Sequence, residues 1–150
     1  MRIVEKPWGQ EKKRTTEERK MIFSETTEDH LASVEVYLSE VHDVVVDYDP
    51  LGMDEYWIDD KVVTINDTKS QRHQLFVLLH EAGHVILRDK KDFAEMFPGR
   101  DTSKVEILKE EVLAWEEARR LAKNLHIPLG KDWEIHVRQA IMRYVTWARI

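Results

Sequence analysis

The sequence predicts an α+β domain, in which a small three-stranded antiparallel or mixed sheet packs against a central helix and two to three further helices. Three observations lead to this prediction. The β-branched runs are confined to residues 44–65, apolar residues recur at helical spacing on both sides of that region, and residues 71–88 are apolar nearly all round. A helix without a polar face is surrounded by other elements, so we expect residues 71–88 at the centre of the domain.

Composition indicates one domain without disulfides. The chain has 150 residues, of which 42% are hydrophobic, and it has no cysteine, which fits a single core. Residues 1–27 are expected to form a charged, poorly ordered arm, because they hold few large apolar side chains. The domain then spans residues 28–150.

Partners and location are constrained by charge and hydropathy. The net charge of −6 makes direct nucleic-acid binding an unfavoured function, because phosphate contacts require surplus lysine and arginine on one face. No apolar run approaches the roughly 18 residues that span a bilayer, and the first residues lack the pattern of a secretory signal. We expect a cytoplasmic protein that does not enter the membrane.

The first elements of the domain are a helix and three strands. Apolar residues at helical spacing follow threonines that can cap a helix, which predicts a helix over residues 28–40. Residues 44–48 form a β-branched run that ends in the turn sequence Asp-Pro-Leu-Gly. Residues 56–58 and 62–65 flank a short polar connection, which predicts a hairpin.

The remaining elements are helices. Residues 66–70 offer several capping side chains, and no proline interrupts residues 71–88. After Pro98 and Gly99, either Thr102 or Ser103 can cap a helix that runs to about Leu125. A last amphipathic helix is expected to follow Gly130.

The central helix carries a motif of the form HExxH, which reads His80-Glu81-Ala82-Gly83-His84. Helical residues four apart share one face, so both imidazoles can bind one ion, while Glu81 is offset and can act as a general base toward a water molecule. Without cysteine, the ligands must be imidazole and carboxylate. Zinc (Zn²⁺) fits such a site, because catalytic zinc commonly takes two histidines and a glutamate and leaves one position for water.

Coincidence is the alternative explanation of the motif. Apolar residues enclose it on both sides along the chain, and burying two imidazoles and a carboxylate without partners would be costly. A metal ion supplies that partner. Gly83 within the helix also indicates that another element approaches closely there.

The third ligand is expected from the helix that follows Ser103, whose glutamates are Glu106, Glu110, Glu111, Glu116 and Glu117. At roughly 100° per residue, Glu111 falls near the middle of the apolar face, Glu110 toward its edge, and the other three well outside it. Glu111 is therefore the predicted ligand, with Glu110 left open. An inward glutamate could instead form a buried ion pair with an arginine such as Arg88 or Arg138.

Three other polar residues are weaker candidates. His126, His136 and Tyr144 could orient a ligand or stabilise an oxyanion. A lone histidine beside apolar neighbours is more often a packed or surface residue. We therefore assign these three no role from the sequence.

With these residues identified, residues 44–122 resemble the ImmA/IrrE family of zinc-metallopeptidase-like proteins. The resemblance rests on the segments KVVTIND, RHQLFVLLHEAGHVILR and EEVLAWEEARRLA. Family members typically show a glutamate followed three and seven residues later by small residues, as Glu111 is by Ala114 and Ala118. Where the family often has a segment like LLMP, this chain reads NLHIP.

The resemblance implies a zincin-like metallopeptidase domain with His80, His84 and Glu111 as ligands and Glu81 as base. It further implies a protein substrate, often a helix-turn-helix repressor of a phage, mobile element or stress response. Two alternatives stay open. One is a metal-stabilised module that binds a repressor or toxin without cleaving it, and the other is a DNA-associated protease like the SprT group, which the basic residues of the arm suggest.

Overall fold

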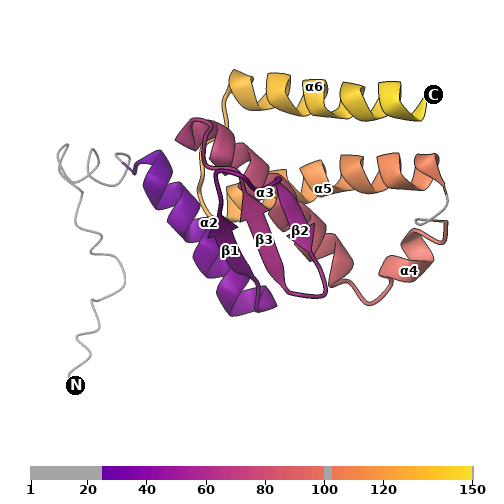
Figure 1. Ribbon diagram of the computed structural model, residues 1–150, viewed down its shortest axis with the longest axis horizontal. Coiled ribbons are helices and arrows are strands. Elements are labelled where there is room, and N and C mark those ends of the chain that lie inside the picture. Colours follow the sequence, from indigo (N-terminus) through magenta and orange to yellow (C-terminus); the bar gives the residue numbers. More distant parts are fainter. Residues whose placement is uncertain (1–24, 100–102, 150) are drawn as a thin grey trace, which may run out of the picture.

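A computed structural model describes residues 25–99 and 103–149 (Figure 1). The predicted arm, including the basic residues on which the SprT-like alternative depends, lies outside the described residues except for 25–27. In the described ranges the elements are α2 (Thr27–His42), β1 (Val45–Tyr48), β2 (Glu55–Trp57), β3 (Val62–Ile65), α3 (Gln71–Arg88), α4 (Phe93–Met96), α5 (Lys104–Asn124) and α6 (Lys131–Ala148). The predicted α+β class is confirmed.

Capping side chains fix where three of the long helices begin. The side chain of Thr26 accepts a hydrogen bond from the backbone N–H of Asp29 at the start of α2. Ser70 and Ser103 cap α3 and α5 in the same way. These side chains satisfy N–H groups that have no partner within the helix. Ser103 is thus a cap of α5, and Thr102, the alternative, lies outside the described residues.

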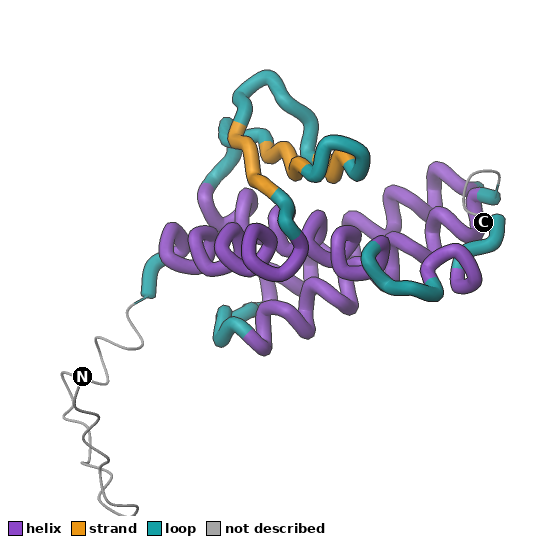
Figure 2. The backbone as a smooth tube through the Cα atoms, turned by 90° about the horizontal axis from the view of Figure 1, so that it is seen from below, coloured by secondary structure: helices purple, strands orange, loops and turns teal. Residues whose placement is uncertain are grey.

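The sheet is mixed, and β3 is its central strand. The strand order is β1-β3-β2, with β1 parallel to β3 and β2 antiparallel to it. Val63 and Ile65 of β3 are fully buried, because alternate residues of a strand face the same side. Figure 2 shows the strands as a layer on one side of the helices. Among the described residues β2 pairs only with β3, so β2 is an edge strand.

Helix α3 runs through the middle of the domain and passes behind the sheet (Figure 1). Its buried side chains include Leu75, Leu78 and Leu79, which are completely inaccessible to solvent. This burial on several sides explains the absence of a polar face in the sequence. No helix in the described ranges combines the length and hydropathy that a membrane crossing requires.

Helices α3 and α5 touch through their backbones at Gly83. A Cβ atom placed on Gly83 would lie 2.0 Å from the carbonyl oxygen of Ala114, so any side chain at this position would push the helices apart. The close approach predicted at Gly83 is confirmed. It brings Glu111, one turn before Ala114, beside the turn of α3 that carries the two histidines.

Candidate metal centre

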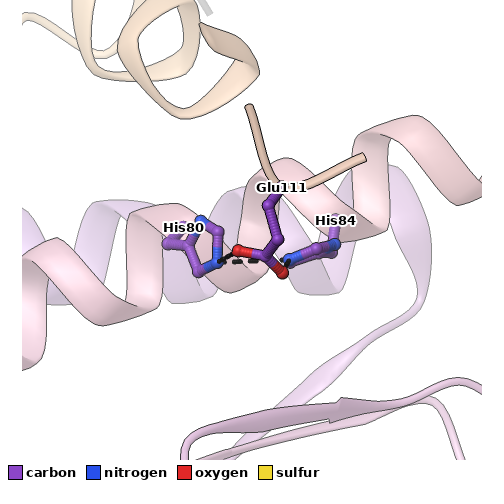
Figure 3. A group of neighbouring side chains, drawn as sticks. All are labelled: His80, His84 and Glu111. Carbon is purple, nitrogen blue, oxygen red and sulfur yellow. Dashed lines mark hydrogen bonds and ion pairs between the residues drawn. The ribbon is translucent and has the colours of Figure 1, made fainter. Parts of the chain in front are cut away.

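His80 and His84 project from α3 toward Glu111, which reaches them from α5 (Figure 3). The carboxylate oxygens of Glu111 lie 2.9 Å from Nε2 of His80 and 2.9 Å from Nε2 of His84. The two Nε2 atoms are 3.2 Å apart. The structure therefore brings the three predicted ligand residues together, with one oxygen of Glu111 beside each Nε2 atom and one donor atom of each residue within 4.8 Å of the others.

The hydrogen-bonding capacity of these buried groups is incompletely used. The side chains of His80, His84 and Glu111 are 11%, 13% and 8% exposed. Oε2 of Glu111 is near Nε2 of His80 but not aligned for a hydrogen bond, and it has no hydrogen-bond partner among the described residues. Only one of the two facing Nε2 atoms can donate to the other, and an N–H group used in this way is not available to Glu111. A cation between the three side chains would satisfy these atoms.

The donor set and its spacing fit a divalent metal ion. Ligand atoms at about 2.0–2.2 Å from a tetrahedral zinc ion are separated by roughly 3.4 Å, close to the 2.9 Å and 3.2 Å separations found here. Two imidazole nitrogens and one carboxylate oxygen suit zinc and other first-row ions. His80, His84 and Glu111 form the group in the described residues that could hold a metal ion.

The ionisation of the group reflects burial and mutual attraction. Burial lowers the pKa of His80. Burial opposes the charge of Glu111, but the two imidazoles beside it outweigh this effect and hold the pKa of this carboxyl well below its usual range. Burial also opposes the charge of His84, but Glu110 and Glu111 raise the pKa of its imidazole to about 10. The cluster thus favours positive charge beside the Glu111 carboxylate.

Glu81 lies next to this group and has a different environment. It is 8% exposed, and its carboxylate makes no hydrogen bond or ion pair with the residues that the structure describes. Burial raises the pKa of Glu81 to about 8. A carboxylate with such a pKa can exchange a proton near neutral pH.

A cleft of about 360 Å³ separates the candidate centre from the edge strand. The segment around β2 forms one wall, α3 and α5 form the other, and α6 contributes one residue. The lining residues are Met53, Asp54, Glu55, Tyr56, Ile58, Glu81, His84, Arg88, Glu110, Glu111 and Tyr144. Glu81 and two of the three candidate ligands therefore face a space that can admit another molecule.

The glutamates of α5 separate into different environments. Glu110 is 1% exposed and accepts a hydrogen bond of 2.7 Å from Nε of Arg88, so the arginine pairing that was considered for an inward glutamate is found at Glu110 and not at Glu111. The placement of Glu117 well outside the buried face was wrong. It is buried and pairs with Lys90 and Arg120 at 3.0 and 2.8 Å.

Trp115 is a site residue that the sequence interpretation missed. Its ring stacks on that of His80, with the centroids 4.0 Å apart and an angle of 18° between the planes. Trp115 is four residues after Glu111, and residues at this spacing share a helix face. That spacing was a signal that could have placed Trp115 beside the histidines.

The three weaker candidates lie in separate places. His136 packs against His73 and Trp115, with ring centroids 5.2 and 5.5 Å away. His126 is exposed in the turn after α5, with φ of 57°. Tyr144 lines the cleft. Of these three, Tyr144 is the one that shares a cavity with Glu81.

Comparison with known proteins identifies the family. The family model described as the IrrE N-terminal-like domain, peptidase family M78, matches residues 40–131. Neither curated proteins nor solved structures gave a significant match. The matched stretch covers more than half of the chain and contains the sheet, the HExxH motif of α3 and all of α5. The chain therefore belongs to the IrrE N-terminal-like domain family, as its resemblance to ImmA/IrrE proteins indicated.

Proposed function

We propose that the protein is a zinc-dependent metallopeptidase that hydrolyses a peptide bond of a regulatory protein in the cytoplasm. His80, His84 and Glu111 are the zinc ligands in this proposal, and Glu81 is the general base. The observation that carries it is the position of Glu81, a buried carboxylate without a partner among the described residues, at a cleft beside three converging donors. Membership of a metallopeptidase family supports the same reaction class.

The chemistry assigned to Glu81 is proton transfer. A bound zinc ion would supply Lewis acidity and make a water molecule easier to deprotonate. The Glu81 carboxylate accepts a proton from the attacking water and then delivers it to the departing amine nitrogen. Glu81 lines the same cleft as His84 and Glu111, where the proposed reaction would place the water and the scissile bond.

A peptide substrate fits the cleft because an edge strand forms one wall. Within the described part of the chain, β2 uses only one edge to pair with β3, and the residues around it line the cleft. An extended peptide can bind to such an edge through its backbone. The specific substrate, a helix-turn-helix repressor, follows from the ImmA/IrrE resemblance.

The experiment compares wild-type protein with Glu81→Gln and with Glu116→Gln, which changes an exposed glutamate of α5. Zinc content is measured by mass spectrometry, and cleavage is measured on a peptide library derived from a bacterial proteome. We expect about one zinc per chain in all three proteins and a loss of cleavage of roughly 10²–10⁴-fold in Glu81→Gln alone. Undiminished cleavage by Glu81→Gln would reject this residue as the base.

A second candidate function is a non-cleaving binding module that the metal stabilises. The low exposure of the three donor side chains favours it, because structural zinc sites are closed. In that case a repressor or toxin would co-purify intact with wild-type protein and equally with Glu81→Gln. Cleavage of the library by wild-type protein would exclude this function.

A further inference from the structure

The second ring nitrogen of His84 faces a buried carboxylate. Nδ1 of His84 lies 3.8 Å from Oε1 of Glu110, a residue that precedes Glu111 and is 1% exposed. This separation is longer than a hydrogen bond, and a small rotation of the imidazole toward Glu110 would close it. His84 thus has a carboxylate at each nitrogen, Glu111 at Nε2 and Glu110 at Nδ1.

Glu110 is held in this position by Arg88. Nε and Nη2 of Arg88 donate to the two oxygens of Glu110 at 2.7 and 3.4 Å. The Arg88 guanidinium in turn lies over the ring of Phe93, 4.5 Å from its centroid. Bidentate contact with a planar guanidinium restricts the orientation of a carboxylate. Glu110 therefore presents Oε1 to His84 in a fixed direction.

If His84 binds a metal, its two ring nitrogens must differ in protonation. A neutral imidazole carries one proton, and the nitrogen that binds a metal must be the one without it. Nε2 faces His80 and Glu111 at 3.2 and 2.9 Å, so the proton must be on Nδ1. A buried N–H group needs an acceptor, and Glu110 provides one.

His80 is held in another way. Its Nδ1 has no hydrogen-bond partner among the described residues, and its ring stacks on Trp115. Packing therefore orients His80, whereas a carboxylate faces the corresponding nitrogen of His84. Of the two histidines, His84 is therefore the one whose Nδ1 faces a carboxylate.

We propose that Glu110, fixed by Arg88, is a positioning residue that keeps the proton of His84 on Nδ1 and directs the Nε2 lone pair to the metal. The inference rests on the proposed metal site at His80, His84 and Glu111. Ligating histidines commonly donate their other N–H to a carboxylate, and removal of that carboxylate typically costs 10–100-fold in metal affinity.

The test compares Glu110→Gln with Glu117→Gln, a matched control. Both residues are buried glutamates of α5. Glu110 forms an ion pair with Arg88, and Glu117 forms one with Lys90. Glu117 differs in that it is not among the residues paired with the histidines. The zinc dissociation constant is measured by competition with a chromophoric chelator, and the visible absorption of the cobalt-substituted protein reports ligand geometry. Circular dichroism verifies that each variant is folded.

We expect Glu110→Gln to bind zinc about 10–100-fold more weakly and to change the cobalt spectrum, while Glu117→Gln retains the wild-type affinity and spectrum. If Glu110→Gln does not fold because Arg88 is left unpaired, the double variant Arg88→Met with Glu110→Gln removes both charges and should show the same loss of affinity. Equal zinc affinities in wild type and Glu110→Gln, or equal losses in both glutamine variants, would overturn the inference.

Failure of this inference is distinguishable from failure of the proposed function. A wild-type protein that binds zinc and cleaves peptides, together with a Glu110→Gln variant of unchanged affinity and spectrum, overturns the positioning role alone. A wild-type protein whose zinc binding does not depend on His84, tested with His84→Ala, overturns both.

Discussion

Glu111 and Glu117 lie on the same helix with similar burial, yet their surroundings differ. Glu117 contacts Lys90 and Arg120, whose side chains are 39% and 66% exposed, so two solvated cations balance its charge. Glu111 contacts two nearly buried imidazoles, and its Oε2 has no hydrogen-bond partner in the described residues. Both cations contact Oε1 of Glu117, and neither oxygen of Glu117 is a buried atom without a partner, in contrast to Oε2 of Glu111.

The difference shows which observation points to a ligand. Burial of a carboxylate is common to both positions and therefore does not identify a site. An oxygen without a hydrogen-bond partner among the described residues, next to two ring nitrogens that face each other, distinguishes Glu111, because such an arrangement is costly unless a cation completes it. Experiments that remove the cation, the helix contact or a charge should therefore affect the surroundings of Glu111 more than those of Glu117.

The largest effect is expected from Gly83→Ala. The new Cβ would collide with backbone at 2.0 Å, which no rotamer change relieves, so the free energy of unfolding should fall by about 3 kcal/mol or more. Both partners of Glu111 lie across this contact on α3, whereas Arg120 remains beside Glu117 on α5, so zinc affinity should be lost as well. Urea unfolding and zinc titration measure the two losses.

Gly99→Ala is the control for that substitution. The nearest neighbour of its added Cβ would be Ser103 Cβ at 3.3 Å, a side-chain contact that a small shift can relieve. We expect it to retain zinc affinity. Wild-type stability and affinity in Gly83→Ala would contradict the close approach of α3 and α5.

Metal removal should give the next largest effect, because it takes away only the contribution of zinc, which Gly83→Ala loses in addition to its packing cost. With free zinc at 1,000 times its dissociation constant, binding stabilises the native state by about 4 kcal/mol, and a chelator should abolish that gain in wild-type protein. Glu111→Gln should show little response to zinc or chelator, whereas Glu117→Gln should keep the wild-type response. Thermal unfolding with and without zinc checks this, and an equal response of the two glutamine variants would remove the distinction between Glu111 and Glu117.

A smaller effect is expected from pH in the metal-free protein, where Glu81 of α3 is a further buried carboxyl group beside Glu111. Burial raises the pKa of Glu81 from 4.5 to about 8, so the unfolded chain loses this proton at lower pH than the native protein. The contribution of Glu81 to the free energy of unfolding is therefore fully present below pH 4.5 and is lost as the pH rises through 8.

The measurement is the urea-unfolding free energy of metal-free wild type and Glu81→Gln at pH 5 and pH 8. Wild type should lose up to about 3 kcal/mol more than the variant over this range. The same pH dependence in both proteins would mean that burial does not raise the pKa of Glu81.

Local features made the helices and much of the candidate centre predictable. Capping residues and prolines mark the ends of α3 and α5, and the structure begins and ends these helices within a residue or two of the expected positions. The convergence of His80, His84 and Glu111 followed from spacing within two helices and from one glycine. Each of these signals involves residues close together in the chain.

The remaining features depend on contacts between distant segments. The parallel pairing of β1 with β3 could not be read from strand composition, which is why the sheet type was left open. The one-turn helix α4 is too short to show periodicity. Glu117 was misplaced because its partner Lys90 comes from the end of another helix, and the role of Arg88 beside Glu110 has the same origin.

The stacking of Trp115 on His80 has a practical consequence. Indole fluorescence responds to charges and rings in direct contact, and these two rings are 4.0 Å apart and nearly parallel. We therefore expect binding at His80 to change the emission of Trp115, one of the five tryptophans of the chain. Such a change would report that event in solution without a dye or label.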